Sequence, residues 1–502
     1  MLSRALPVLW LLYFGTGIVL QGYFAETALL TLNLILYAAV SVVLLVRREL
    51  AFSVSHLLLL LLTAAYWAAV PLGADREQAV LEAARVSGLL PLSLLFSLIP
   101  AGRLGRLYGL WPWIGALVAA AGTALGMERN GRLEATLDYA NALAIFLLVN
   151  VVVCVLAMAG QRRFPHAALL AVNAAGLLLT FSRSVWVLWL IAVCAAFVWI
   201  KELRRPAAAI AVGAAHLCGL ALALLVKGDA LFFVQRVSSI QARASELQIR
   251  LVYWRDSLAM IRDHWLTGSG GGGWSVLLDR YRSADYYVRF VHNHYLQTAL
   301  DAGAAALLAL AAWLALFYWT AWRRLRAEHG GDAVLTKGVV LLVTVMALHA
   351  GFDIDLTFPV LFGVLASLVV PMSPVRYRFR LSGSTAGLLV PAGAAAVLLW
   401  FWLAVAYASL QAANEHARAG RHPEAQVLFH RTERMIPWQT SAYYGEAKSL
   451  IRQGNETGDA AYYRSAADRL ERAIERVPQQ TLYTGLLDQL KVPPSNSDHS
   501  TN

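Results

Sequence analysis

Charged residues are scarce in this chain of 502 residues. Asp, Glu, Lys and Arg together make up 15% of it, whereas soluble globular chains carry about 25%. Hydrophobic residues reach 59%, and the mean hydropathy is +0.56. Because the shortage of charge extends over most of the length, it excludes a single soluble domain and indicates an all-α polytopic membrane protein.

Cysteine is also rare, and nucleotide-binding motifs are missing. The three cysteines, Cys154, Cys194 and Cys218, lie in apolar runs, and no CxxC pair occurs. We therefore expect small buried hydrophobes, and neither a zinc site nor a disulfide framework. The Gly-rich run at residues 268–273 is not followed by Gly-Lys-Ser/Thr, so it is no P-loop. A flexible turn is its simplest interpretation, and close approach of the backbone to a ligand is the alternative.

The net charge of +11 does not by itself predict nucleic-acid binding. Most Lys and Arg residues stand in short clusters between apolar runs, where they act as signals of membrane topology. The expected partner is therefore the lipid bilayer, and no nucleic acid.

Long apolar runs divide the chain. A membrane-spanning helix needs about 20 apolar residues, and the sequence predicts about 13 spans, or 12 if one of the two short runs fails to cross. The candidates are residues 5–23, 27–46, 54–71, 86–100, 105–126, 139–159, 165–181, 184–200, 206–226, 294–320, 334–352, 358–371 and 384–409. The first run lacks a small-residue cleavage site, so we expect it to remain as a signal anchor.

Basic clusters follow every second run, which orients the chain by the positive-inside rule. With the N-terminus in the cytoplasm, the cytoplasmic loops contain Arg47, Arg48, Arg103, Arg106, Arg162, Arg163, Lys201, Arg204, Arg205, Arg323, Arg324, Arg326, Arg376, Arg378 and Arg380. The short outer loops contain only Arg76, Arg85, Arg129, Arg132 and Arg183. Residues 127–138, Arg183, the large loop 227–293 and residues 349–355 are then all expected on the outer face. Because ATP is absent from that face, chemistry there requires a pre-activated substrate.

The large loop contains the first candidate site residues. An amphipathic helix is expected near residues 243–265, and His292-Asn293 stands just before the tenth span. A histidine at an outer membrane boundary can stay hydrated and act as a general base; an interfacial histidine without a role is the alternative. His294 points to another helix face than His292, so the two are not expected to share a metal.

Three arginines on the outer side are candidates for anion binding: Arg183, Arg250 and Arg289. A guanidinium at the bilayer boundary is costly unless it snorkels or binds an anion, and its fork matches phosphate oxygens. Salt bridges to aspartates of the large loop are the alternative; the candidates are Asp256, Asp263, Asp279 and Asp285. His349, Asp353 and Asp355 lie at another outer boundary, where a structural polar contact is expected because a third strong metal ligand is lacking.

The chain changes character after residue 410. Residues 411–491 read as soluble helical hairpins with breaks at Gly420, Pro437 and Gly454 and a period near 34 residues, which is typical of tetratricopeptide arrays. The predicted organisation is therefore a membrane domain at 1–410, an extracytoplasmic helical region at 411–491 and a disordered tail at 492–502. The helical region is expected to contact an envelope protein.

Five segments resemble the O-antigen ligase and polymerase superfamily of bacterial membrane glycosyltransferases. They are GRLEATLDYANALAIFLL (131–148), FSRS (181–184), RLVYWRDSLAMIRDHWLTGSGGGGW (250–274), VHNHYLQTALDAGAAALL (291–308) and LHAGFDIDL (348–356). The resemblance implies an enzyme of the bacterial inner membrane that moves a glycan from a polyprenyl (undecaprenyl) diphosphate to a hydroxyl of a glycan, lipid or protein. It implies no metal and no other cofactor.

By position, the resemblance makes His292 the base that deprotonates the acceptor and Asn293 the residue that orients it. Arg183 would hold the diphosphate, with Arg250 and Arg289 as weaker candidates for the same role. Secondary candidates are Asn141, His294, His349 and Asp353. A transporter or flippase of lipid-linked sugars and an inert envelope scaffold are the alternatives from other classes. A transporter predicts charges near the middle of broken helices, and the sequence has few charges inside the expected spans.

Overall fold

The computed structural model describes residues 2–160, 164–228, 244–328 and 330–491. This part of the chain is helical except for two small antiparallel sheets, one of β1 (Glu49–Ser53) with β4 (Val375–Arg380) and one of β2 (Glu128–Arg129) with β3 (Arg132–Leu133). The expected disorder of residues 492–502, the topology signal of Arg162 and Arg163, and residues 229–243 of the large loop lie outside the described residues.

Nine helical stretches of the described chain are long and apolar enough to cross a membrane, so the protein is a polytopic membrane protein. They are Glu26–Arg47, Val54–Leu72, Arg76–Ser97, Gly102–Ala124, Ala140–Ala157, Pro206–Lys227, His294–Ala327, Gly331–Ala350 and Gly383–Arg418. Four shorter apolar helices are Ala5–Val19, Phe164–Leu179, Arg183–Trp199 and Pro359–Met372. Each of the thirteen predicted runs overlaps one of these helices, while the number that cross the bilayer stays a prediction.

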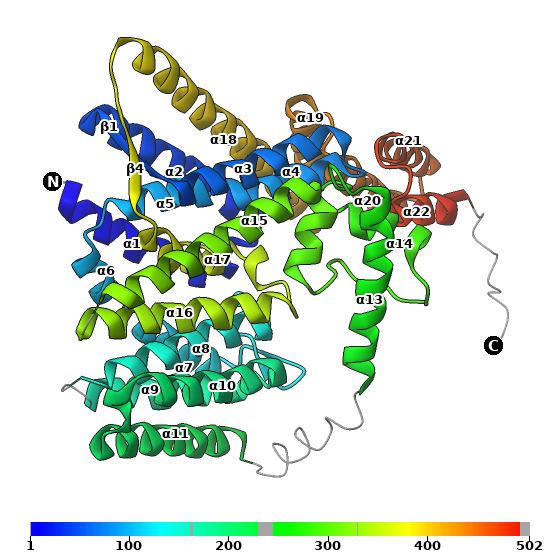
Figure 1. The fold of residues 1–502 in the computed structure, drawn as a ribbon. Helices are drawn as coiled ribbons and strands as arrows, with labels where there is room; N and C mark the ends of the chain where they lie inside the picture. Colours follow the sequence, from blue (N-terminus) through cyan, green and yellow to red (C-terminus); the bar gives the residue numbers. More distant parts are fainter. Residues whose placement is uncertain (1, 161–163, 229–243, 329, 492–502) are drawn as a thin grey trace.

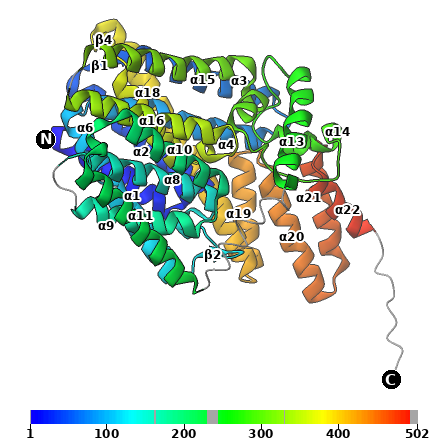
Figure 2. The same ribbon diagram turned by 60° about the horizontal axis from the view of Figure 1, so that its bottom comes forward.

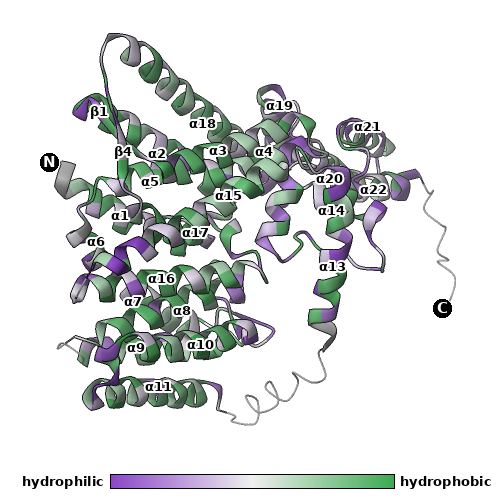
Figure 3. Cartoon of the chain, viewed as in Figure 1, coloured by the Kyte–Doolittle hydropathy of each residue, from purple (hydrophilic) through white to green (hydrophobic). Residues whose placement is uncertain are grey.

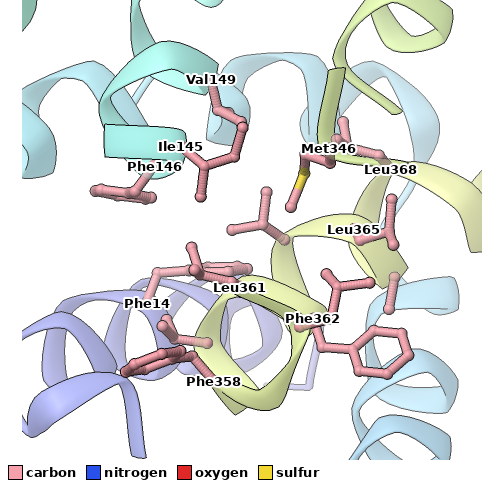
Figure 4. Packing of buried hydrophobic residues seen from close by; sticks show 14 of the residues in the cluster. Phe14, Ile145, Phe146, Val149, Met346, Phe358, Leu361, Phe362, Leu365 and Leu368 are labelled. Carbon is pink, nitrogen blue, oxygen red and sulfur yellow. The ribbon is translucent and has the colours of Figure 1, made fainter. Parts of the chain in front are cut away.

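The core of the bundle forms where four helices meet: α1 (Leu2–Val19), α8 (Ala140–Ala157), α16 (Gly331–Ala350) and α17 (Pro359–Val369). Figure 4 shows Phe14 of α1 and Phe146 of α8 on one side of Leu361 of α17, with Met346 of α16 beyond. All 11 residues of α17 are buried. A helix of that length rises only about 17 Å, roughly half of the hydrocarbon core, so α17 is enclosed by its neighbours.

The remaining membrane helices surround this core (Figures 1 and 3). They are α2 (Glu26–Arg47), α3 (Val54–Ala69), α6 (Ala101–Tyr108), α7 (Trp111–Ala124), α9 (Phe164–Leu179), α10 (Arg183–Trp199), α11 (Pro206–Lys227), α15 (His294–Ala327) and α18 (Gly383–Arg418). Short 3-10 helices connect them: η1 (Gln21–Tyr23), η2 (Val70–Leu72), η3 (Ala135–Leu137), η4 (Lys201–Arg204), η5 (Asp355–Thr357) and η6 (Val370–Met372). Cys154 is buried as predicted, but Cys194 and Cys218 are exposed on α10 and α11. They lie on the outer surface of the bundle, because an apolar sequence suits a lipid-facing position as well as a core position.

The fourth predicted span differs from the prediction. It begins at Arg76, ten residues earlier than expected, and consists of α4 (Arg76–Ser87) and α5 (Leu89–Ser97). Arg76 and Arg85 therefore lie in a helix and not in an outer loop. The expectation of few charges inside spans is also wrong here, because Glu82 and Arg85 are buried and pair at 3.1 Å. Hydropathy alone misses α4 because charged residues lower the hydropathy of this segment. In the structure, Glu82 and Arg85 pair with each other, which makes their burial tolerable.

The Gly-rich run is a packed connection and not a flexible turn. It joins α13 (Ala244–Asp263) to α14 (Gly273–Tyr281) and lies between α4 and α15, where Ser269 N donates to Leu300 O at 2.6 Å. A Cβ at Gly270 would stand 2.5 Å from Cα of Gly73. Opposite the run, Gly303 interrupts α15 with φ +72°, and a Cβ there would lie 2.2 Å from Leu266 O. The glycines therefore allow the backbone to pack closely against other backbone segments of the protein, and the expected close approach to a ligand is not what the structure shows here.

The two ends of the bundle differ. At one end β1 and β4 bring together the segments that follow α2 and precede α18. At the opposite end lie α13, α14 and the C-terminal helices (Figures 1 and 3). This grouping agrees with the predicted alternation of basic and outer loops, while the side of the membrane that each end faces stays a prediction.

The C-terminal helices form consecutive antiparallel neighbours, visible in Figure 2: α19 (His422–Met435), α20 (Thr440–Thr457), α21 (Ala460–Arg476) and α22 (Thr481–Lys491). The predicted breaks at Gly420 and Pro437 are confirmed, but Gly454 lies inside α20, which ends before Gly458 at φ +72°. Glu77 of α4 fastens this region to the membrane domain, since its carboxylate accepts bonds from Ser441 N (2.9 Å) and Thr440 Oγ1 (3.2 Å). The tetratricopeptide assignment stays a prediction.

Candidate active site

Segments that are far apart in the sequence meet at the end of the bundle that carries α13. Arg132 donates to Thr180 O at 2.8 Å and to Asn141 Oδ1 at 2.6 Å. Lys227, at the start of the large loop, pairs with Glu128 at 2.7 Å. The four polar features that were predicted to share one face are therefore brought to one end of the bundle.

Asp353 is the centre of this region. Its side chain is fully buried between α16 and η5. Oδ1 accepts a hydrogen bond from Tyr139 OH at 2.6 Å and lies 3.2 Å from Nδ1 of His292. Oδ2 accepts bonds from Asn141 Nδ2 at 2.5 Å and from Arg250 Nη2 at 3.4 Å. One carboxylate thus joins the loop before α15, helix α13 and the start of α8.

The surroundings of Asp353 favour its ionised form. Burial alone would raise the pKa of this carboxyl, but His292, Arg250 and His349 outweigh burial and hold the pKa well below its usual range. Burial raises the pKa of the neighbouring Asp355 against the opposing effect of His349. A fixed negative charge beside His292 is therefore part of the site at neutral pH.

His292 is held by the residues that follow it. Its backbone is left-handed, with φ +53°, which is strained for a residue with a Cβ. On one side of it, Gln297 Oε1 accepts a bond from Val291 N at 3.0 Å. On the other side, the Asn293 side chain caps α15 by accepting bonds from Tyr295 N and Leu296 N, each at 3.1 Å. The imidazole is a quarter exposed, and because Nδ1 faces Asp353, Nε2 is the atom that can meet a substrate.

A second hydrogen-bonded chain connects Arg183 to the same region. Ser184 Oγ lies 3.1 Å from Nε2 of His349, and Nδ1 of His349 bonds to Asp355. Asp355 is two residues from Asp353, and Ser184 adjoins Arg183, which is half-buried at the first turn of α10. These hydrogen bonds therefore hold the first turn of α10, which carries Arg183, to the segment that contains Asp353 and Asp355.

The three candidate arginines have different surroundings. Arg250 bonds to Phe352 O and to Asp353, so the expected alternative, a bridge to an aspartate of its own loop, is wrong for this residue. The aspartates of that loop have other contacts: Asp279 and Asp285 pair with Arg282, and Asp256 accepts from Tyr286 OH at 2.7 Å. Arg289 is exposed; it donates to Gln78 at 3.3 Å and lies over the Phe24 ring at 5.6 Å.

Residues 166–311 match a family model described as O-Antigen ligase. The chain carries an O-antigen ligase domain. A domain of this family implies an enzyme of the glycosyltransferase type. No curated protein matches the chain. The match includes all three candidate arginines together with His292 and Asn293, and it ends before Asp353.

The structure changes the ranking of the candidate residues and adds two to them. The sequence predicted a structural contact at Asp353 and ranked it as a secondary candidate, whereas its carboxylate joins His292 to Arg250. Tyr139 and Gln297 were not singled out, although both stand in the segments that carry the resemblance. His294 is buried against the Phe362 ring, whereas His292 contacts Asp353.

A cluster of metal-ligand residue types occurs outside the candidate site. Among the described residues, His430, Glu433 and Glu446 of the C-terminal helices lie close enough to hold an ion. Arg469 reaches all three, at 2.9 Å to His430, 3.4 Å to Glu433 and 3.1 Å to Glu446. A guanidinium therefore supplies the positive charge at this group, which favours a structural cluster over a metal centre.

Proposed function

We propose that this protein transfers a glycan from a polyprenyl diphosphate carrier to an acceptor hydroxyl on the extracytoplasmic face of the bacterial inner membrane. The observation that carries the proposal is the single buried carboxylate of Asp353, which contacts both the candidate base His292 and the candidate diphosphate ligand Arg250. Base and anion-binding group are thus held side by side, as a transfer from a diphosphate requires.

In this proposal, His292 Nε2 takes the proton of the acceptor hydroxyl while the oxygen attacks the anomeric carbon of the donor. The bond from that carbon to the diphosphate oxygen breaks, the diphosphate leaves, and attack from the opposite side inverts the anomeric centre. Asp353 holds the imidazole by Nδ1 and stabilises the imidazolium that forms. Asn293 acts on His292 through the helix cap and not by contact with the base.

Arginines take the place of a divalent ion on the leaving diphosphate. Arg183 and Arg250 offset the charge that develops there, since guanidinium groups keep their charge and bond phosphate oxygens in pairs. Arg289 is the weaker candidate, because it lies over Phe24 beside Gln78. His349 and Asp355 are positioning residues for Arg183, and Asn141 is one for Asp353.

The decisive experiment replaces His292. His292→Ala should abolish transfer from a purified lipid-linked donor by the full chain in lipid nanodiscs, while His264→Ala, in the same large loop, should leave it intact. Arg183→Ala should weaken binding of undecaprenyl diphosphate, and Arg183→Lys should restore little because an ammonium lacks the fork. EDTA should not change the rate; loss of activity in EDTA would contradict the metal-free mechanism.

Deletion of the gene distinguishes between three proposed reactions: polymerisation, ligation and protein O-glycosylation. Loss of glycan length with attachment kept indicates a polymerase, and retained length with loss of attachment indicates a ligase. Loss of sugar from an envelope protein indicates protein O-glycosylation.

A transporter of lipid-linked sugars is the rival from another class. The buried Glu82, Arg85 and Asp301 inside candidate spans favour it. A transporter would move donor across vesicles even with His292→Ala, and an inert scaffold would show no effect of that change in any assay. Loss of transfer with normal membrane insertion would exclude both.

A further inference from the structure

A small cavity lies next to Tyr139, a hydrogen-bond partner of Asp353. Its volume is about 160 Å³, and it lies between η1, the start of α8 and η5. Its walls include the rings of Phe24, Tyr139 and Phe358, and its rim includes Gln21 and Asp138, which are both exposed.

The aromatic walls are arranged as a stack. The rings of Tyr139 and Phe358 are 6.0 Å apart with 9° between their planes, and Phe24 lies 4.9 Å from Phe358. Ring faces carry negative potential and attract the polarised C–H groups of a saturated sugar ring. A mostly apolar cavity with a few polar groups at its rim is the usual form of a small-molecule site.

The cavity is joined directly to the proposed base. Tyr139, one of its walls, donates to the same Asp353 oxygen that faces His292. The other oxygen of Asp353 faces Asn141 and Arg250. Asn141 Nδ2 also donates to Tyr139 OH at 3.3 Å, so the cavity wall, Asp353 and His292 belong to one hydrogen-bonded network, and Arg250 bonds to the second carboxylate oxygen.

We propose that this cavity binds the terminal sugar ring of the acceptor. The ring stacks on the aromatic walls, Gln21 and Asp138 bond its hydroxyl groups, and the attacking hydroxyl points toward His292. The inference rests on the proposed function for the role of this sugar, and it predicts a glycan acceptor over an unglycosylated protein or a bare lipid.

Binding tests this inference without any turnover. Because the acceptor is unidentified, the probe is a panel of methyl pyranosides of glucose, galactose, mannose and their N-acetylamino forms, observed by saturation-transfer NMR with the full chain in nanodiscs. Ring protons of at least one member should show saturation. Gln21→Ala and Asp138→Asn should each weaken this binding about fivefold, the equivalent of one hydrogen bond of about 1 kcal/mol. Both positions are exposed, so the variants should fold.

Controls separate this site from its neighbours. Gln479→Ala and Asp285→Asn, exposed and outside the cavity, should leave pyranoside binding unchanged. Binding of undecaprenyl diphosphate should be the same in Gln21→Ala as in the unchanged chain.

Absence of saturation across the panel, or equal saturation in Gln21→Ala, Asp138→Asn and the unchanged chain, overturns the proposal. If the cavity variants lose the sugar while His292→Ala retains transfer, the acceptor cavity stands and the proposed function fails.

Discussion

The Nδ1 atom of His292 lies 3.2 Å from Oδ1 of Asp353, although 61 residues separate the two in the chain. His292 precedes α15 and Asp353 follows α16, so the contact closes the helical hairpin of α15 and α16 at one end. The Asp353 carboxylate is fully buried, and the imidazole of His292, which is a quarter exposed, is one of its hydrogen-bond partners. The pair therefore ties the candidate base His292 to the fold.

Asp353→Asn should lower the rate of transfer by about 100-fold or more, since a positioned base and its partner contribute factors of this order. The amide can still bond to neighbours but cannot stabilise an imidazolium. Because the pKa of Asp353 is held well below its usual range, its charge is constant above about pH 5. The defect should consequently be the same from pH 6 to pH 9, measured as kcat with purified donor.

Asp285→Asn is the matched control, because that carboxylate is 99% exposed and lies outside the cluster. It should keep a rate within twofold of the unchanged protein. A rate for Asp353→Asn close to that of Asp285→Asn would show that the buried carboxylate has no catalytic part.

Gln297→Leu should displace His292 without removing any group that touches substrate. Its Oε1 holds Val291 N at 3.0 Å, and its Nε2 bonds to Asp301 at 2.9 Å. Without the first bond, only the packing of the buried Val291 side chain opposes relaxation on this side of the strained left-handed backbone at His292. We expect kcat to fall about tenfold with the donor KM unchanged, and faster hydrogen exchange at Val291.

The exposed Gln411, which bonds only along its own helix, supplies the comparison. Gln411→Leu should change neither kcat nor exchange at Val291. If Gln297→Leu raises the donor KM and leaves kcat intact, its role is in substrate binding and not in positioning the base.

Glu77→Ala should loosen the C-terminal helices from the membrane domain. The buried carboxylate of Glu77 accepts two hydrogen bonds from the start of α20, and Arg76 beside it lies 4.9 Å from the Trp438 ring. Removing a buried acceptor leaves its donors unsatisfied, at a cost of about 1–3 kcal/mol. Proteolysis between α18 and α20 should become several-fold faster in membranes, while exposed Glu471→Ala should be cut like the unchanged chain. Unchanged proteolysis of Glu77→Ala would mean that the aromatic contacts alone fix the helices.

Hydropathy predicted the positions of the apolar helices because a span must contain a continuous run of apolar residues. It missed the first turns of α4 because charged residues lower the hydropathy there; the burial of Glu82 and Arg85, which pair three residues apart, depends on tertiary packing that hydropathy does not record. The break of α15 at Gly303 was beyond prediction for a similar reason. It depends on Leu266, a residue of the large loop that packs against this position.

For the candidate site, the order of the segments was enough to propose His292, Arg183 and Arg250, and their roles stay predictions. It was not enough to rank them against Asp353, whose importance comes from four partners contributed by three distant segments. The aromatic cavity was equally hidden, since Phe24 and Phe358 look like ordinary apolar residues at the ends of spans.

The C-terminal helices should lose stability as the pH rises through about 8. Burial raises the pKa of Glu446 from about 4.5 to about 8; Arg469 opposes this shift and the neighbouring Glu433 adds to it. A carboxyl with a raised pKa holds its proton in the folded state, so its stabilising effect is fully present below about pH 4.5 and is lost as the pH passes 8. Hydrogen exchange of α20 in the full chain, corrected for the intrinsic rate, should therefore be slower at pH 6 than at pH 9.

Glu446→Gln, which mimics the protonated form, should remove this difference, whereas Glu471→Gln at an exposed position should preserve it. Equal protection at both pH values in the unchanged chain would mean that Arg469 keeps Glu446 ionised throughout.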